Sequence, residues 1–328
     1  MVFIVSAELT LHQSFLMDKL CSQRVIIYSG DLSDLDFGRL TIKIQTGEPF
    51  MRNSVRYALF VTLVCSSACI GLFGRPAADD SAMRQADHDF VLAVTKSDQP
   101  ALGKLLDKNF MWIDSNGKAL AKTQVLQAVP MPGIADEAGA ELKHYIYEDV
   151  GDVQANLGRV HTLRVWVKRP AGWRIIVYQE VTSLIASPSF APGAGKDCQN
   201  PCKSVGYEPK NDAEKQVVSA YQRLETAAMA HDSGHFSTLV GDEFAAASSN
   251  SNKVYDKRGR MDDFDHSKMA GVAPTPLESA RMFDFNGAVV MTSIHRPDRG
   301  KPLRVTRLWV SRDGRWQETL SYQTSVTP

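Results

Sequence analysis

A six-residue pattern occurs twice in the chain. Residues 164–169 read Arg-Val-Trp-Val-Lys-Arg and residues 307–312 read Arg-Leu-Trp-Val-Ser-Arg, so four positions are identical at a constant offset of 143. Each copy runs into a turn and a second tryptophan, which is Trp173 in the first copy and Trp316 in the second. A repeat at this spacing is typical of two domains that share one fold. The pattern predicts an architecture and does not by itself indicate a reaction.

Length and charge fit two globular domains. The 328 residues are enough for about two domains with their own cores. Basic and acidic residues balance at 37 each, whereas nucleic acid or an anionic membrane surface as the main partner would call for clustered positive charge. From Met83 onward, no apolar run approaches the ~20 residues that a membrane-spanning helix needs. We therefore expect no nucleic-acid partner and no membrane span in this part of the chain.

One long apolar run lies at residues 57–68. It follows Met51 and two arginines and ends in small residues, which is the order of a secretory signal peptide. We predict a signal peptide over 51–68 and an exported protein, either periplasmic or secreted. Residues 1–50 would then lie upstream of the true start and be disordered. The alternative is a cytoplasmic tail before an uncleaved membrane anchor.

Export changes the interpretation of the cysteines. Cys69 directly follows the signal and is a candidate for lipid attachment, although Ser66 stands where a lipoprotein signal usually has leucine. Cys198 and Cys202 lie in a segment rich in proline and glycine, 186–211, which we interpret as a linker. In an oxidising compartment such a close pair most often forms a disulfide. A metal site at this pair would need two further ligands, and none is near in sequence.

The rest of the chain divides into two similar units, 82–185 and 212–328. Each unit shows amphipathic helical spacing, a second short helix, a strand, a third helix and then several strands, which is the order of an α+β domain. Asn211 is expected to cap the first helix of the second unit, with Glu214 reaching back to it. The predicted fold class is therefore α+β, with two tandem domains in which a curved antiparallel sheet wraps around helices.

The two units differ in length. The offset between them is 134 in the helical part and 143 in the repeated strands, so the second unit has about nine extra residues, which we place within 249–276. The dipeptide Tyr-Gln at 178–179 recurs at 322–323, at an offset of 144. This shift predicts one inserted residue after Trp316 and a β-bulge in that strand.

The order of elements and the repeated hairpin resemble the nuclear-transport-factor-2-like superfamily, whose cone-shaped α+β fold is shared by ketosteroid isomerases, scytalone dehydratase and polyketide cyclases. The closer resemblance is to an uncharacterised bacterial branch akin to the polyketide cyclases. It covers 82–185 and 213–326, and it implies the fold without a catalytic residue. The aspartate base and oxyanion donors of ketosteroid isomerases have no residue-by-residue counterparts here. The motif residues are Ser97-Asp98, His231-Asp232, Asn116-Gly117 in the first copy only, and the two repeated hairpins, which resemble the branch's typical pattern V-W-V-x-R-x-x-G-x-W.

Side chains alternate across each repeated strand. The aliphatic residues at positions 163, 165 and 167 point one way, and Arg164 and Trp166 point the other. We expect the aliphatic set to face the helices. The other two side chains, and their counterparts Arg307 and Trp309, would then lie on the outer sheet face, and residues of these types are frequent in buried interfaces. We predict an intramolecular pseudo-dimer with these four side chains at its seam; the alternative is partly exposed sheet residues in contact with strand neighbours.

The first unit offers the candidate chemistry. Asp114 and His161 would converge in its apolar pocket and act as general acid and base, because burial tunes the pKa of such groups toward neutrality. Trp112, Tyr145 and Gln179 are candidate ligand-binding residues. Alternatively, Asp114 shapes the Ser-Asn-Gly turn that follows it, and His161 is a hydrogen-bonded wall residue.

The second unit lacks these groups. At the matching offsets, alanine and serine replace the tryptophan and the aspartate, and Arg304 replaces His161. Arg304 would bind an anionic ligand or close the pseudo-dimer. His231 and His235 have metal-ligand spacing, but they straddle a predicted helix start and need not share a face. Since no phosphate loop or nucleophilic triad is evident either, we expect no metal and no cofactor.

These patterns lead to a prediction of function in general terms. We expect an exported protein that binds a small apolar or amphipathic ligand or acts as a scaffold in the envelope. The alternative is a cofactor-free lyase or isomerase that acts in the pocket of the first unit. Membrane contact is expected only through the signal anchor or a lipid at Cys69.

Overall fold

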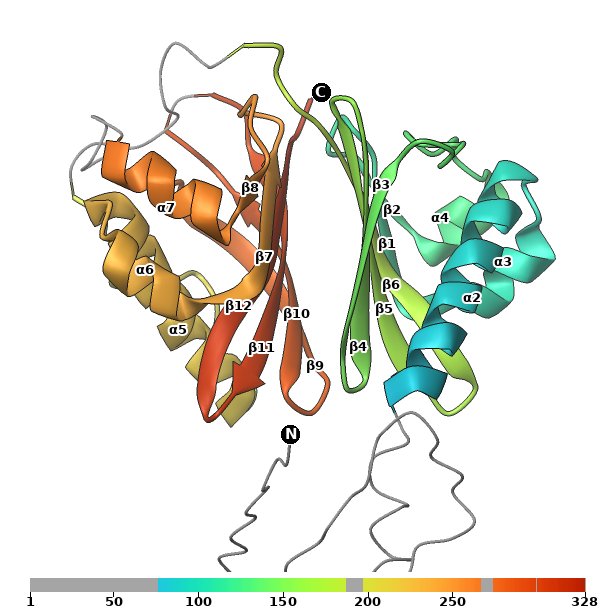
Figure 1. The fold of residues 1–328 in the computed structure, drawn as a ribbon, viewed down its shortest axis with the longest axis horizontal. Coiled ribbons are helices and arrows are strands. Elements are labelled where there is room, and N and C mark those ends of the chain that lie inside the picture. Colours follow the sequence, from blue (N-terminus) through green and yellow to red (C-terminus); the bar gives the residue numbers. More distant parts are fainter. Residues whose placement is uncertain (1–75, 187–196, 267–273, 299, 328) are drawn as a thin grey trace, which may run out of the picture. The chain divides into compact units, whose positions relative to one another are not determined.

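The computed structural model describes four segments of the chain, 76–186, 197–266, 274–298 and 300–327 (Figure 1). All four belong to one compact unit. In these segments no helix is long and apolar enough to cross a membrane. The predictions for 1–50, the signal peptide at 51–68 and Cys69 lie outside the described residues.

The first domain is a six-stranded sheet with helices on one face (Figure 1). The strand order is β2-β1-β6-β5-β4-β3, and β1 and β6 are parallel while their other neighbours are antiparallel. In chain order its elements are α2 (Pro76–Thr95), α3 (Gln99–Leu105), β1 (Leu106–Ile113), β2 (Ala119–Ala121), α4 (Lys122–Gln127), β3 (Glu141–Tyr147), β4 (Val150–Leu157), β5 (Val160–Arg169) and β6 (Gly172–Thr182).

The second domain repeats this plan, with strand order β8-β7-β12-β11-β10-β9 and a parallel pair β7–β12. Two six-stranded sheets with attached helices confirm the α+β class and the tandem arrangement. Its elements are α5 (Asp212–Ala230), α6 (Ser233–Leu239), β7 (Val240–Ser248), β8 (Tyr255–Asp256), α7 (Lys257–His266), β9 (Leu277–Asp284), β10 (Ala288–His295), β11 (Leu303–Arg312) and β12 (Arg315–Ser325).

Side-chain caps begin the helices where the sequence places them. The Asp98 carboxylate accepts the N–H of Ala101 at the start of α3, and Asp232 does the same at α6 for His235. This cap explains why aspartate stands between the two histidines of 231–235. Among the described residues, no group of three or more potential ligands is placed to hold a metal.

The predicted disulfide is present. Cys198 and Cys202 form a disulfide. At the start of α5, Asn211 caps by accepting the N–H of Glu214. Glu214 does not reach back to Asn211; its carboxylate accepts the N–H of Lys210.

The repeated strands keep one register throughout. Arg164 pairs with Tyr178, and Arg307 pairs with Ser321, so the offset stays at 143 along β6 and β12. Each hairpin has its irregularity at the same place, just before the shared tryptophan of β5 or β11. The predicted insertion after Trp316 is therefore wrong. Tyr178 corresponds to Ser321, so the Tyr-Gln pair at 322–323 lies one position beyond the pair at 178–179.

The extra residues of the second domain fall at two places. Pairing with β5 and β11 aligns Val150 with Ala288, an offset of 138. About half of the extra residues therefore lie in the connection between β10 and β11, outside the predicted range 249–276.

The two sheets pack face to face, with the helices on their outer sides (Figure 1). The core between the sheets is built from strand residues alone, among them Leu163, Val165 and Leu308. Arg164 and Trp166 point instead to α2, and Trp309 lies in the helix-side core of the second domain. The predicted alternation is thus present, but the predicted faces are exchanged.

The exchange has a physical reason. Both faces of each sheet are buried, so alternation separates two sets of side chains without saying which set meets the helices. A buried arginine is stable only beside a carboxylate, and α2 supplies Asp87 at 2.7 Å from Arg164. The face opposite the helices can then be aliphatic and pack against the other sheet.

Polar contacts also join the domains across this seam. Gln179 Nε2 donates to the carbonyl of Tyr322 at 3.1 Å and to Thr324 Oγ1 at 3.0 Å. The Asn-Gly turn that occurs only in the first copy takes part, because Arg304 donates to the carbonyl of Gly117. Gly117 has φ +72°, and a Cβ there would lie 2.9 Å from the backbone of Ser325. The turn therefore fits the C-terminal strand of the second domain, which explains its absence from the second copy.

Candidate functional site

The space between helices and sheet is filled in the first domain. Trp112 on β1 stacks on Tyr178 on β6, with ring centres 3.8 Å apart. Phe90 on α2 contacts both rings, and Trp166 meets Phe90 edge-on. All four side chains are at most 2 % exposed. Aromatic rings therefore occupy the volume in which a ligand would have to lie.

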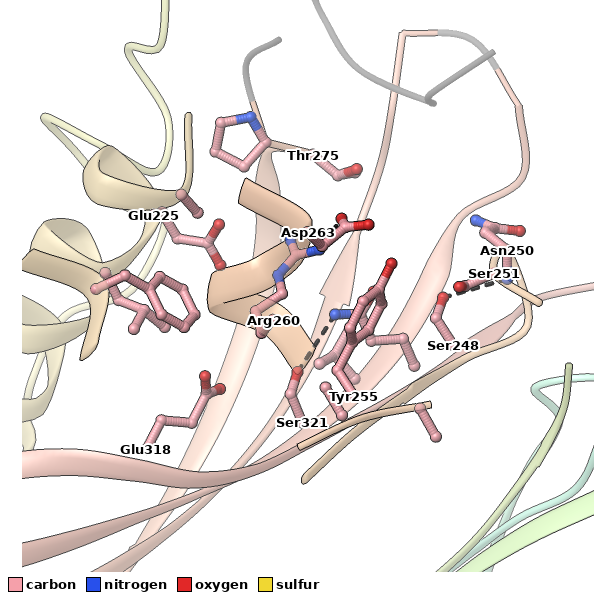
Figure 2. Close-up of a pocket in the computed structure, with 18 of the residues that line it drawn as sticks. Glu225, Ser248, Asn250, Ser251, Tyr255, Arg260, Asp263, Thr275, Glu318 and Ser321 are labelled. Carbon is pink, nitrogen blue, oxygen red and sulfur yellow. Dashed lines mark hydrogen bonds and ion pairs between the residues drawn. The ribbon is translucent and has the colours of Figure 1, made fainter. Parts of the chain in front are cut away.

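The second domain replaces the stacked pair with small residues. Trp112 pairs with Tyr178 across the parallel strands, and Ala246 pairs with Ser321 in the same way. Both small residues line a cavity of about 500 Å³ (Figure 2). This volume falls within the range of small-molecule sites, roughly 300–1,000 Å³. The open pocket is thus in the second domain, where two large rings are missing.

Helices and strands both contribute apolar side chains to the cavity wall. Helices α5, α6 and α7 supply one side, and strands β7 and β11 supply the other. The apolar lining residues are Leu224, Ala228, Met229, Phe236, Phe244, Ala246, Ala247, Phe264, Leu303 and Val305.

The polar end of the cavity is centred on Arg307, whose guanidinium faces four groups. Its Nη2 donates to Glu225 Oε1 at 2.7 Å. Its Nε lies 2.8 Å from Glu318 Oε1, an ion pair without hydrogen-bond alignment. Its Nη1 lies 3.3 Å from His295 Nε2, and its guanidinium carbon lies 4.8 Å from the ring centre of Tyr221. Each guanidinium nitrogen of Arg307 is therefore already engaged.

Burial determines the protonation of this polar end. It raises the pKa of Glu318 to about 8 and also raises the pKa of Glu225, and the nearby charge of Arg307 offsets only part of either shift. Burial, helped by Arg307, lowers the pKa of His295 to about 3. His295 Nδ1 is 3.0 Å from the carbonyl of Thr275, so Nδ1 donates and Nε2 is the acceptor that faces Arg307. At neutral pH, Glu318 holds a proton and His295 is uncharged.

A second polar group lies on the α7 side of the cavity (Figure 2). The half-buried Arg260 lies 4.4 Å from the ring centre of Phe264 and 5.0 Å from that of Tyr255. Asp263 contacts both Arg260, at 3.5 Å, and Lys253, at 3.0 Å. These contacts orient Arg260 along an aromatic surface.

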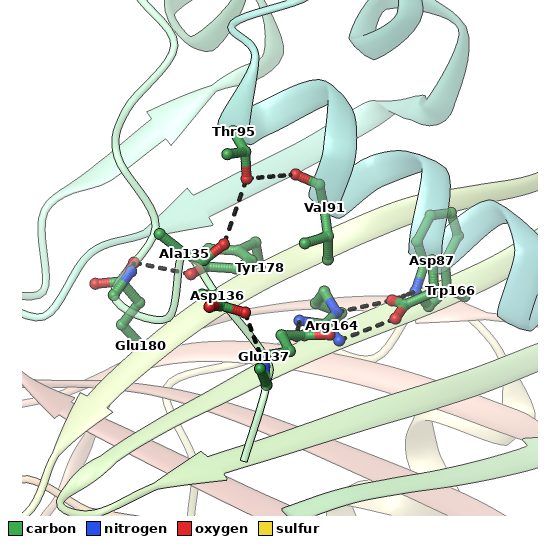
Figure 3. Close-up of polar contacts among 12 residues, drawn as sticks. Asp87, Val91, Thr95, Ala135, Asp136, Glu137, Arg164, Trp166, Tyr178 and Glu180 are labelled. Atoms are coloured by element: carbon green, nitrogen blue, oxygen red, sulfur yellow. Dashed lines mark hydrogen bonds and ion pairs between the residues drawn. The ribbon is translucent and has the colours of Figure 1, made fainter. Parts of the chain in front are cut away.

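The first domain uses the equivalent arginine differently. Arg164 makes two hydrogen bonds to Asp87, at 2.7 and 2.9 Å, and one to Glu137, at 2.6 Å (Figure 3). Asp87 also accepts the indole N–H of Trp166. Glu137 belongs to the loop before β3, and Ala135 of that loop lies within hydrogen-bond distance of Thr95 on α2. This cluster is a packed structural network, whereas its counterpart faces a cavity.

The predicted catalytic pair has structural partners. Asp114 Oδ1 accepts the N–H of Asn116 and of Lys118, so it shapes the turn, as the alternative interpretation expected. The His161 ring nitrogens lie 2.9 Å from Asn156 Oδ1 and 2.8 Å from Ser183 Oγ. His161 shares the strand face of Leu163, which meets the other sheet. No hydrogen bond between described residues joins Asp114 to His161.

The predicted ligand-binding residues lie away from the cavity. Trp112 is part of the first domain's filled core, and Gln179 and Arg304 make the seam contacts described above. Tyr145 pairs with Asp152 on β4, on the face that meets the other sheet. Of the residues predicted for a site, only Arg307, predicted for the seam, lines the open pocket.

Sequence reasoning missed Glu225, Glu318 and His295. One available signal was Glu318, because in the sequence it alternates with Trp316, Leu320 and Tyr322, and a charge in such an apolar series calls for a partner. The other signal was the loss of two aromatic positions. The loss of the tryptophan was noted, but the loss of the tyrosine was hidden because the Tyr-Gln identity suggested the wrong alignment for Tyr178.

The sequence matches no family model and no curated protein. Among solved structures, the chain is similar to an NTF2-like protein from Cytophaga hutchinsonii (16% identity, 35% of this chain and 98% of that one, TM-score 0.30). It is similar to an NTF2-like protein of unknown function from Pseudomonas putida (15% identity, 34% and 85%, TM-score 0.29). A third is an NTF2-like protein of unknown function in nutrient uptake from Rhodospirillum rubrum (17% identity, 34% and 98%, TM-score 0.28). Each match spans about a third of this chain.

Proposed function

We propose that the second domain binds a small ligand with an apolar body and a polar end, while the first domain is its structural partner. The observation that carries the proposal is the replacement of the stacked pair Trp112 and Tyr178 by Ala246 and Ser321 in an otherwise equivalent fold. The replacement leaves a volume suited to a small molecule. Burying an apolar body there contributes about 25 cal/mol per Å² of its surface.

A variant that restores the missing rings tests the proposal. Ala246→Trp with Ser321→Tyr should fill the cavity as the first domain is filled. Native mass spectrometry of the purified protein should find a retained small molecule on the wild type and none on the filled variant. Ala171→Trp places a tryptophan at an exposed turn, outside the cavity, and serves as the control. Equal ligand retention by wild type and filled variant would count against the pocket.

Export is the second part of the proposal. The disulfide between Cys198 and Cys202 supports it, because such bonds persist in oxidising compartments. Intact-mass analysis of protein from a cell fractionation would test both expectations for the N-terminus. Cleavage after Ala68 gives one mass, and a lipid on Cys69 adds the mass of its acyl chains. Recovery of an uncleaved chain from the cytoplasmic fraction would contradict export.

A further inference from the structure

The polar end of the pocket sets two carboxyl groups against one guanidinium. Glu225 enters from α5 and Glu318 from β12, and both contact Arg307. Figure 2 shows both carboxyl groups directed toward the cavity. Glu318 is 2 % exposed, and its Oε1 lies 2.8 Å from Arg307 Nε without hydrogen-bond alignment. A buried carboxyl oxygen without a well-aligned donor carries a desolvation cost, so a further donor supplied by a ligand would be favoured there.

The neighbouring groups of the same wall leave few donors free for an anion. Arg307 has each of its nitrogens engaged, which leaves little for an anionic ligand. His295 is uncharged, and its acceptor nitrogen Nε2 lies 3.0 Å from Ser293 Oγ and 3.3 Å from Arg307 Nη1, so it adds no positive charge to the wall. The wall therefore complements a group that donates hydrogen bonds and carries positive charge.

The charge of the Glu318 carboxylate can be neutralised either by a proton or by a ligand cation. Burial raises the pKa of Glu318 to about 8, so at neutral pH a proton neutralises the second carboxylate. A ligand cation placed against the carboxylates would take over this task and release the proton. The charged and titratable groups around Glu318 are Arg307 on β11, Glu225 and Tyr221 on α5, Arg260 on α7, and His295 on β10 beyond Arg307.

We propose that the pocket selects ligands whose apolar body carries a cationic amino group, with the amino group held against the carboxylates of Glu225 and Glu318. This inference rests on the proposed ligand-binding function and adds the charge class of the ligand. Arg260 and Lys253 also line the cavity, but on the α7 side, where both contact Asp263. An anionic probe tests whether these cations dominate instead.

Three probes with one apolar body separate the charge classes: phenethylamine, phenethyl alcohol and hydrocinnamate. Their affinities for the full chain are measured by isothermal titration calorimetry. The amine should bind at least about tenfold more tightly than the alcohol, because a charge-assisted hydrogen bond replaces a neutral one. The acid should bind most weakly.

Conservative variants test whether the two glutamates cause the preference for the amine over the alcohol. Glu318→Gln and Glu225→Gln each replace an ionisable carboxyl group with an amide, and each should reduce the amine's advantage over the alcohol to about threefold or less while the alcohol's affinity stays the same. Glu278→Gln removes an exposed carboxylate that pairs with Arg296 and is the matched control. The amine's affinity for the control should equal that for the wild type.

Proton release needs no variant. At pH 7, amine binding in buffers of different ionisation enthalpy should release close to one proton per ligand, and the amine's affinity should rise toward pH 8 as Glu318 ionises. Equal affinity for amine and alcohol, or tightest binding of the acid, overturns the cationic selectivity and leaves the pocket's binding function intact. Failure of all three probes to bind the wild type overturns the ligand-binding function itself.

Discussion

Trp112 stacks on Tyr178 at 3.8 Å between ring centres, and this pair separates a filled domain from an open one. Trp112→Ala should destabilise the first domain by about 3–5 kcal/mol, because it removes a fully buried indole and leaves a cavity. The free energy of unfolding in urea measures the effect.

Adding a ring to the cavity of the second domain should not destabilise the protein in the way that removing Trp112 does. Ala246→Trp enters existing space, so it should change stability by less than about 1.5 kcal/mol. Destabilisation of the second domain as large as that from Trp112→Ala would mean that its cavity is tightly packed and does not admit a ring.

Asp87 supports both repeated residues of the first domain. It accepts two hydrogen bonds from Arg164 and one from the indole of Trp166. Asp87→Ala should therefore cost about 3–5 kcal/mol, because it leaves a buried guanidinium with Glu137 as its remaining carboxylate.

A surface ion pair on the same helix provides the comparison. Asp80→Ala breaks the exposed pair with Arg84, and it should cost less than about 1 kcal/mol. Thermal unfolding of the two variants side by side measures the difference. Similar losses would show that the Asp87 network carries little of the first domain's stability.

The seam contains a titrating carboxyl group. Asp152 is fully buried there, Oδ1 accepts from Gln154, and Oδ2 has no hydrogen-bond partner. Burial and the charge of Glu243 raise the pKa of Asp152 to about 7, well above its unfolded value near 3.8. The protonated form is therefore favoured by folding, and this contribution is fully present below pH 4 and is lost as pH rises through 7.

Asp152→Asn keeps the shape and removes the titration. Relative to wild type, the variant should gain stability between pH 4 and 7 and reach a plateau above pH 8, by on the order of 4 kcal/mol. Urea unfolding at a series of pH values gives the difference curve. Because Glu318 is present in both proteins, its own titration cancels in that difference. A flat difference curve would contradict the assigned protonation of Asp152.

Much of the fold was accessible from local signals. Caps at Asp98 and Asp232 act within one helical turn, and the repeated hairpin fixes its own strand pairing, so sequence patterns record both. The sequence pattern did not show which face of each sheet the helices cover. Alternation of Arg164 with Val165 is the same whether helices or a second sheet cover the aliphatic side, and only the position of Asp87 on α2 decides it.

The site was less accessible, because a cavity is defined by what is missing. Its polar end combines Glu225 from a helix with Glu318 and Arg307 from two strands, and no short motif links them. The disulfide, in contrast, joins cysteines four residues apart and was predicted correctly. Contacts between residues close in the sequence were therefore predictable, and the site that joins residues far apart in the sequence was not.

Gln179 links the two domains through a single side-chain nitrogen. Nε2 lies 3.0 to 3.2 Å from Thr324 Oγ1 and from the carbonyl oxygens of Tyr322 and Arg304. Gln179→Ala should destabilise the protein by about 1–3 kcal/mol, because it leaves buried acceptors of the second domain without a donor. Since the domains share one core, the loss should appear in both of them.

Tryptophans report on each domain separately. Trp112→Phe with Trp166→Phe and Trp173→Phe leaves only second-domain tryptophans, and Trp309→Phe with Trp316→Phe leaves only those of the first domain. In both backgrounds, Gln179→Ala should lower the urea midpoint of the fluorescence transition by a similar amount. Gln85→Ala, which removes only an exposed contact to Asp89 within α2, should leave both midpoints nearly unchanged. A shift confined to one background would show that the domains unfold independently and that the seam is only a contact between two self-sufficient folds.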